Sequence, residues 1–348
     1  MTMTKQILVG GVPVGGGAPV TIQSMTNTPT EDVQATTDQI RRLAAAGCQI
    51  VRVAVPTMAA AKAVGKIKEA IDLPLVVDIH FDYRLALECI AAGADKVRIN
   101  PGNIGGADRV KAVAQACARK NIPIRIGVNG GSLEKPLLAK YGGVTPQALV
   151  DSAFGHIAML NRYDFDDICI SLKSSSVPIT MGAYQLMHQQ SNYPLHLGVT
   201  EAGTTRMGTL KSAAGIGGLL ALGIGDTLRV TLTADPVEEI YAARDILKAI
   251  GLRREGPDLI ACPTCGRTKI DLIPLAQEVE QRLKSVTKPI TVAVMGCPVN
   301  GPGEAAAADV GIAGGNGKGL LFRRGEVVKQ VPQEALVDEL MALIEALP

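Results

Sequence analysis

Eight short runs rich in β-branched residues alternate with Ala- and Leu-rich stretches between residues 20 and 250. Strands that alternate with helical segments form parallel sheets, because each helix carries the chain back to the start of the next strand. Eight such units in succession favour an α/β fold of the closed (β/α)8 TIM-barrel type over an open doubly wound sheet. The predicted strands are Val20–Met25, Ile50–Val55, Leu75–Ile79, Lys96–Asn100, Ile122–Val128, Asp167–Leu172, Leu195–Val199 and Thr227–Leu232.

The stretches between these strands have the composition of helices. Two of them end in Ala-Gly, at Gly47 and Gly93, and glycine is the residue that most often follows the last turn of a helix. The clearest predicted helices are Thr37–Ala46, Met58–Ala70, Arg84–Ala92, Arg109–Lys120, Pro146–Asn161 and Pro236–Ile250.

The alternation stops at the run 251–257, which we interpret as a linker. A barrel of this type takes roughly 250 residues, so roughly a hundred remain for a second domain. We therefore predict a barrel domain at 1–252 and a small α+β domain at 258–348. Its predicted elements are strands at Asp258–Ala261, Ile290–Met295 and Asp309–Ala313, helices at Leu272–Lys284 and Gln333–Ala346, and a hairpin through Gly319–Val331 that turns at Arg324-Gly325.

Composition narrows the classes of partner. The formal net charge is only +2, aromatic residues make up 3%, and tryptophan is absent, which argues against nucleic-acid binding. No apolar run reaches the ~18 residues of a membrane helix, and the first ten residues lack the apolar centre of a secretory signal. The seven cysteines are odd in number and unevenly spaced, which argues against a disulfide framework. We expect a cytoplasmic protein with reduced thiols.

Polar residues gather at the carboxyl ends of the predicted strands, where barrel enzymes place their active sites. An arginine between apolar strand residues is seldom buried without a partner. For any one of these arginines, an ion pair with a barrel carboxylate is the simpler explanation. The barrel offers too few carboxylates at that depth to pair them all, because Asp78 and Glu201 are the obvious ones. Guanidinium groups match phosphate oxygens, so we expect the barrel mouth to bind a phosphorylated small molecule. The cations of this set are Arg52, Arg98, Arg125, Arg229 and Lys173.

Two residues at these strand ends are candidates for proton transfer. Glu201 is the stronger one, because neighbouring groups can tune the pKa of a carboxyl at a barrel mouth. A salt bridge to Lys173 or an arginine is its structural alternative. His80 could equally be a histidine that only satisfies local hydrogen bonds.

Three cysteines lie in the last quarter of the chain, in the runs Cys262-Pro-Thr-Cys265 and Gly296-Cys297-Pro-Val-Asn-Gly-Pro-Gly-Glu304. A Cys-x-x-Cys run brings two thiolates onto one tight turn, as metal and cluster sites require. No histidine follows His196, so the nearest fourth ligand is Glu304. A [4Fe–4S] cluster, a structural zinc ion and a redox thiol pair all stay open at this point. The remaining cysteines, Cys48, Cys89, Cys117 and Cys169, are expected to be small buried apolar residues.

These residues also carry a resemblance that covers nearly the whole chain. The segments VVDIHFDYRLAL (76–87), KVRINPGN (96–103), IRIGVNGGSLE (124–134), CPTCGRT (262–268) and GCPVNGPGE (296–304) resemble the 4-hydroxy-3-methylbut-2-en-1-yl diphosphate synthase family in its compact bacterial form. The resemblance implies an oxidoreductase of the non-mevalonate isoprenoid pathway. Its reaction would be reductive dehydration and ring opening of 2-C-methyl-D-erythritol 2,4-cyclodiphosphate to (E)-4-hydroxy-3-methylbut-2-enyl diphosphate.

The resemblance further implies a [4Fe–4S] cluster held by Cys262, Cys265, Cys297 and Glu304, with Asn300 beside it. It implies a flavodoxin or ferredoxin as the electron donor, and a head-to-tail homodimer in which one chain's cluster domain caps its partner's barrel. The residues that match the family's substrate site are Arg52, Asp78, His80, Arg98, Asn100, Arg125, Asn129, Lys173 and Glu201, and Thr231 stands where relatives often have serine. Asp78, His80, Glu201 and Glu304 are expected to act in catalysis.

Two other classes of function compete with this interpretation. One is a zinc-stabilised barrel enzyme, an aldolase or synthase that acts on a phosphorylated small molecule, with Lys173 as a Schiff-base candidate. The other is a non-catalytic interaction or nucleic-acid-binding module built on the Cys-x-x-Cys unit. The low net charge and the polar strand ends weigh against the second.

Overall fold

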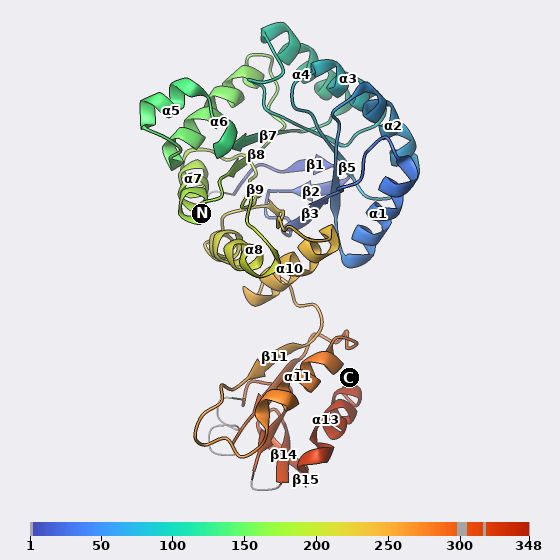
Figure 1. The fold of residues 1–348 in the computed structure, drawn as a ribbon, viewed down its shortest axis with the longest axis vertical. Helices are drawn as coiled ribbons and strands as arrows, with labels where there is room; N and C mark the ends of the chain where they lie inside the picture. Colours follow the sequence, from blue (N-terminus) through green and yellow to red (C-terminus); the bar gives the residue numbers. More distant parts are fainter. Residues whose placement is uncertain (1–2, 298–304, 316–317, 348) are drawn as a thin grey trace. The chain divides into compact units, whose positions relative to one another are not determined.

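The computed structural model describes residues 3–297, 305–315 and 318–347. The chain divides into two compact units, Met1–Leu252 and Arg253–Pro348. Each unit has its own cluster of buried apolar side chains, so each is described by itself. Figure 1 shows the barrel in the first unit and a smaller sheet with helices in the second. Among the described residues, no helix combines the length and the apolar character that a bilayer span requires.

The first unit contains the predicted barrel. Its strands are hydrogen-bonded in the order β8-β7-β6-β5-β4-β3-β10-β9, and a parallel bridge between Ile170 and Leu195 joins the two ends. All pairings between neighbouring barrel strands are parallel, as the helical connections require. The strands are β3 (Thr21–Met25), β4 (Ile50–Ala54), β5 (Leu75–Asp78), β6 (Lys96–Ile99), β7 (Ile124–Asn129), β8 (Ile168–Lys173), β9 (His196–Leu197) and β10 (Thr227–Leu228).

Helices surround the barrel in Figure 1. Several begin at a side chain that satisfies a free backbone N–H, as the Asp32 carboxylate does for Ala35 at 3.0 Å and the Thr57 hydroxyl for Ala60 at 3.1 Å. The helices are α1 (Val33–Ala46), α2 (Met58–Glu69), α3 (Tyr83–Ala91), α4 (Ala107–Lys120), α5 (Lys135–Tyr141), α6 (Pro146–Asn161), α7 (Val177–Gln190), α8 (Thr205–Ser212), α9 (Gly218–Ala221) and α10 (Pro236–Ala249), with a 3-10 turn at Gly130–Ser132 and a π-helical stretch at Ala213–Gly217.

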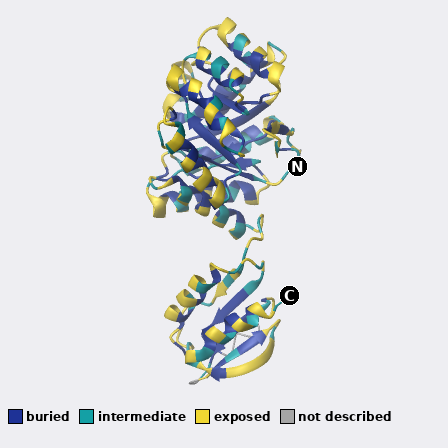
Figure 2. Ribbon diagram, turned by 90° about the vertical axis from the view of Figure 1, so that its right-hand side faces the viewer, coloured by how far each residue is buried: buried dark blue, intermediate teal, exposed yellow. Residues whose placement is uncertain are grey.

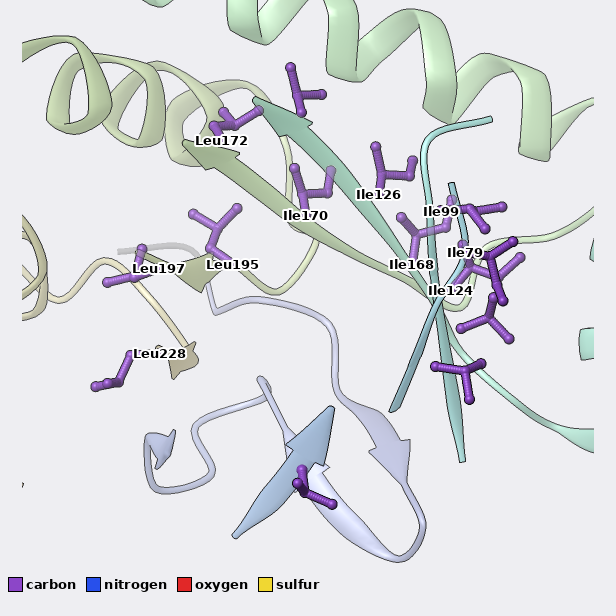
Figure 3. Close-up of a cluster of buried hydrophobic side chains, with 14 of the residues drawn as sticks. Ile79, Ile99, Ile124, Ile126, Ile168, Ile170, Leu172, Leu195, Leu197 and Leu228 are labelled. Carbon is purple, nitrogen blue, oxygen red and sulfur yellow. The ribbon is translucent and has the colours of Figure 1, made fainter. Parts of the chain in front are cut away.

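The two faces of the barrel strands differ in chemistry. Side chains alternate between the two faces of a strand, so residues two apart share a face. The outward residues are apolar and pack under the helices, where each buried Ile or Leu contributes roughly 1.5–3 kcal/mol. Figure 3 shows part of this layer, with Ile79, Ile99, Ile124, Ile126, Ile168, Ile170, Leu172, Leu195, Leu197 and Leu228 labelled. The inward face carries the buried polar residues Thr21, Gln23, Lys96, Arg98, Arg125, Ser171, His196 and Thr227.

A short hairpin precedes the barrel and was not predicted. It consists of β1 (Ile7–Val9) and β2 (Val12–Val14), joined at Gly10-Gly11, where both residues have positive φ. Its apolar side chains pack against Ile50, Val76 and Cys169, which lie near the amino ends of β4, β5 and β8. The hairpin therefore covers the barrel at the end opposite the expected site.

The second unit is a five-stranded sheet with strands in chain order. The first three strands are parallel and the last two are antiparallel. The predicted hairpin turn at Arg324-Gly325 is confirmed, with positive φ at both residues, as in a type I′ turn. The elements are β11 (Asp258–Ala261), α11 (Leu272–Leu283), β12 (Thr291–Met295), β13 (Val310–Gly314), β14 (Lys318–Arg323), β15 (Glu326–Pro332), a 3-10 turn at Gln333–Ala335 and α13 (Leu336–Glu345).

Helices α11 and α13 both contribute to the core of this unit. Leu275 and Val279 of α11 and Leu340 of α13 belong to one buried cluster with Val292 and Ile312 of the sheet. The central strands β12 and β13 are largely buried, whereas β15 is largely exposed, and Figure 2 shows both buried and exposed strands in this unit. The sheet is thus held by its own core, and its strand ends are available to carry other chemistry.

Candidate active site

A polar pocket of about 190 Å³ lies at the carboxyl ends of the barrel strands. Nine of the residues that the sequence singled out for the barrel line it, together with Thr200. The common position of these residues at strand ends explains why residues from seven strands meet in one cavity. The lining residues are Arg52, Asp78, His80, Arg98, Arg125, Asn129, Lys173, Thr200, Arg229 and Thr231.

Asp78 is the negatively charged centre of this pocket. Its Oδ1 accepts a hydrogen bond from Arg98 Nη1 at 2.9 Å, and its Oδ2 lies 3.8 Å from Arg52 Nε and 3.7 Å from His80 Nε2. Burial by itself would raise the pKa of Asp78, but Arg52, Arg98 and Arg125 outweigh it and hold the pKa at about 2. Asp78 is therefore ionised at neutral pH and orients the arginines around it.

The cations repel one another in a dry environment. Burial and the neighbouring positive charges lower the pKa of Arg52 and of Lys173 well below their ordinary values, although Asp78 opposes the shift at Arg52. Burial and Arg98 lower the pKa of Arg125 to about 10. The Arg125 Nη1 donates to Ser171 Oγ at 2.7 Å. Among the described residues, Nε and Nη2 of Arg125 have no partner, so they are free to receive an anion.

Arg229 has a partner that sequence reasoning missed. Its Nε and Nη2 each lie 3.2 Å from a carboxylate oxygen of Glu239, a residue of α10 that is only 3% exposed. The family resemblance did not single out Arg229, although Arg229 is an arginine between apolar strand residues, like the others. Glu239 had no such signal, because it sits in the acidic first turn of a helix, where carboxylates are common.

Two glycines create the space that the long cations occupy. A Cβ at Gly127 would come within 2.4 Å of Arg98 Nε, and Arg98 Nη2 donates to the Gly127 carbonyl at 3.1 Å. A Cβ at Gly198 would lie 2.6 Å from Lys173 Nζ. Both glycines therefore allow a side chain from a neighbouring strand to cross directly over the backbone.

Two predicted site residues do not line the pocket. Asn100 is buried, and its Oδ1 accepts from the Gly102 N–H at 3.1 Å, which fixes the turn after β6. Glu201 is exposed and has a φ of 51°, a left-handed conformation that is uncommon outside glycine. His80 lines the rim, and its side chain is 55% exposed. Direct roles for Asn100 and Glu201 stay predictions.

The cysteines of the second unit lie at one edge of its sheet. Cys262 follows β11 directly and Cys297 follows β12 after one residue, and these strands are parallel neighbours. The Gly296 N–H donates to Cys262 Sγ at 3.1 Å. Cys265 lies on a tight turn in which its N–H donates to Thr268 Oγ1 at 3.2 Å. Hydrogen bonds from the backbone and side chain of Arg267 lower the pKa of the exposed Cys265 thiol.

This donor set fits an iron–sulfur cluster in its chemistry. Three thiols from one sheet edge, with N–H groups directed at sulfur, are the ligands and hydrogen bonds that such clusters use. Among the described residues, no three Cys, His, Asp or Glu side chains meet closely enough to hold a metal ion. The predicted ligand Glu304 and its neighbour Asn300 lie outside the described residues.

The remaining cysteines are buried, as predicted. Burial raises the pKa of Cys48 to about 11 and that of Cys89 and Cys117 to about 12. Burial also raises the pKa of Cys169, against the opposing effect of Lys96. Their thiols stay protonated, so they are poor ligands and nucleophiles.

Fold and site together define a two-unit TIM-barrel protein with a cationic mouth and a separate cysteine-bearing unit. Family models described as the GcpE TIM-barrel domain and the GcpE protein C-terminal domain match residues 4–244 and 258–346. The chain therefore belongs to the GcpE family, and the resemblance seen in the sequence is confirmed.

Curated relatives match over nearly their whole length. A protein of Clostridium perfringens is 60% identical over 344 residues, which cover 99% of both chains, and one of Geobacter sulfurreducens is 58% identical over 342 residues, 98% of this chain and 97% of that protein. Both are named 4-hydroxy-3-methylbut-2-en-1-yl diphosphate synthase (flavodoxin).

Among solved structures, dihydropteroate synthase of Stenotrophomonas maltophilia is similar with a TM-score of 0.52 and 12% identity, over 71% of this chain and 97% of that one. That likeness concerns the barrel fold alone.

We predict that replacing Asp78 with asparagine lowers the free energy of unfolding at pH 7 by about 3–5 kcal/mol, because it leaves buried arginines without their counter-charge. The folded-state pKa of Asp78 is depressed, so its contribution is present above its unfolded-state pKa and is lost as pH falls towards about 2. Urea unfolding at pH 7 and at pH 3 measures this, and the gap between variant and wild type should narrow at pH 3.

The matched control is Asp82→Asn, in the loop that follows β5. Asparagine can still cap the amino end of α3, as Asp82 does. Its unfolding free energy should stay close to that of the wild type. An equal loss of stability in both variants would show that the Asp78 charge has no special role in the pocket.

Proposed function

We propose that this chain catalyses the reductive ring opening and dehydration of 2-C-methyl-D-erythritol 2,4-cyclodiphosphate to (E)-4-hydroxy-3-methylbut-2-enyl diphosphate. The conversion consumes two electrons and two protons and releases one water molecule. The observation that carries the proposal is the barrel pocket, where five cations converge with few counter-charges. A cyclic diphosphate is a compact, highly charged anion that such a pocket suits, and close relatives bear the name of this enzyme.

The pocket's own groups have distinct parts in this proposal. Arg98 and Arg52, oriented by Asp78, hold phosphate oxygens, while the unpartnered edge of Arg125 supplies further donors. Burial and the neighbouring cations lower the pKa of Lys173, and the ligand's negative charge would raise it again, which favours the ammonium form. These interactions orient the ring and exclude water from it.

The second unit supplies the electrons in this proposal. Cys262, Cys265 and Cys297, with Glu304, would hold a [4Fe–4S] cluster. Bound there, the cluster supplies one-electron transfer, which no nicotinamide or flavin motif in the chain provides. The relatives' names specify flavodoxin, so we propose a flavodoxin as the donor, with ferredoxin as the alternative.

The decisive experiment combines metal analysis with turnover on protein purified without oxygen. We expect about four irons and four sulfides per chain and turnover of the cyclic diphosphate with reduced flavodoxin. Cys265→Ser should lose turnover and most of its iron but still bind inorganic pyrophosphate. Cys117→Ala, at a cysteine buried in α4, should keep its turnover and its iron. Stoichiometric zinc without sulfide in active protein would instead support the zinc-stabilised alternative.

We further propose that Glu201 donates a proton to the departing hydroxyl, moving towards the ligand from its exposed position. Glu201→Gln should lower kcat by about 10²–10⁴ and remove the limb of the pH–rate profile on which activity falls with rising pH. Glu238→Gln, at an exposed carboxylate of α10, serves as the control. An unchanged profile in Glu201→Gln would falsify the role.

A head-to-tail homodimer is the assembly we propose. The chain leaves the barrel unit after α10, whose carboxyl end lies at the amino ends of the strands, away from the pocket. A partner's second unit can reach the pocket without a long linker. Mixing inactive Cys265→Ser chains with inactive Arg98→Met chains should recover roughly a quarter of wild-type activity, since half of the dimers then hold one complete site. No recovery after subunit exchange would favour capping within one chain.

A further inference from the structure

Lys96 is a cation that the proposed function does not use. It lies on β6 two residues before Arg98, so its side chain points into the barrel on the same face. Its residue exposure is 0%, and its Nζ has no hydrogen-bond partner within the described part of the chain. A buried ammonium group without a partner is strongly disfavoured, so this position demands a physical explanation.

Other unpartnered polar groups share the barrel interior with Lys96. Thr227 of β10 is paired in register with Thr21 of β3 and His196 of β9, so the three lie at one level. Both ring nitrogens of His196, both hydroxyls and the side-chain amide of Gln23 are buried and lack partners among the described residues. Lys96 does not line the pocket, so this polar layer lies beneath the pocket floor. The N-terminal hairpin covers the barrel's opposite end.

The charged and titratable neighbours of Lys96 come from several strands. Arg125 of β7 and Arg52 of β4 repel its ammonium form, and Cys169 of β8 and His196 of β9 are its titratable neighbours. Burial, more than these charges, lowers the pKa of Lys96 to about 8. Arg52 and Arg125 also line the pocket, so the cations that act on Lys96 are among those that an anion bound there would meet.

We propose that Lys96 is a reserve cation of the anion site, which takes up a proton from solvent when a diphosphate group fills the pocket above it. The bound anion favours the ammonium form, and the ammonium in turn strengthens anion binding by the same factor. The inference rests on the proposed function only for the ligand's identity. It makes diphosphate affinity fall as pH rises through the pKa of free Lys96, in addition to any effect of Lys173.

The test is calorimetric titration of the full-length, anaerobically purified protein in Tris and in HEPES, buffers whose ionisation enthalpies differ. Inorganic pyrophosphate and the cyclic diphosphate are the two probes. The dependence of the binding heat on the buffer gives the number of protons taken up. At pH 8.5 we expect wild-type protein to take up about half a proton or more in excess of Lys96→Met. Lys111→Met, at an exposed lysine of α4, should match the wild type.

A direct titration keeps the inference testable if Lys96→Met does not fold. In protein labelled at lysine ¹³Cε, the Lys96 signal, assigned by its loss in Lys96→Arg, should titrate near pH 8. With pyrophosphate bound, its midpoint should rise by more than one pH unit. Equal proton uptake in wild type and Lys96→Met, or an ordinary lysine titration midpoint in the free protein, overturns the proposal.

The two probes separate this inference from the proposed function. If pyrophosphate binds with Lys96-dependent uptake and the cyclic diphosphate does not bind, the reserve cation stands and the proposed substrate is wrong. If both probes bind without Lys96-dependent uptake, the reserve cation is wrong and the proposed substrate stands.

Discussion

Buried positive charge inside the barrel is the constraint on which the rest of this structure depends. Five cations line the pocket and Lys96 lies below them, while the buried carboxylates near them in the described structure are Asp78 and Glu239. Such an arrangement costs folding free energy, because desolvated like charges repel. The continuous apolar layer between strands and helices supplies the opposing stabilisation. The charged pocket is therefore maintained by a fold whose stability comes from the apolar layer between strands and helices.

The strands meet this constraint by dividing their two faces. On β6, Val97 and Ile99 face the helices, while Lys96 and Arg98 face the interior. Because of this period-2 pattern, one strand contributes apolar side chains to the main core on one face and charged side chains to the site on the other. The N-terminal hairpin completes the division, since its apolar residues separate the polar interior from solvent at the amino ends of the strands.

How much of this could be predicted follows from the range of the interactions. The barrel and its polar mouth were predictable, because alternation and strand ends are local features and the topology brings all strand ends together. The Arg229–Glu239 pair and the contact of Ser24 with Glu239, 215 residues apart in sequence, depend on barrel closure and register. Glu201 is exposed and is not among the lining residues, and its left-handed backbone with φ of 51° is a feature that no strand pattern specifies. The hairpin at Gly10-Gly11 carried a turn signal, but its three-residue strands were too short to predict.

The excess of cations also bears on why a reductive reaction suits this barrel. Under the proposed function, adding electrons to the bound diphosphate would increase the negative charge in the pocket. In a pocket of balanced ion pairs that charge would be opposed by nearby carboxylates. Here the main counter-charge in the lining, Asp78, is already shared by Arg52 and Arg98, and Arg125 keeps unpartnered donors. Fixed cations aimed at developing charge stabilise a transition state without reorganising. The repulsion that destabilises the free protein is thus the feature that would favour the reduced, more negative form of the proposed ligand.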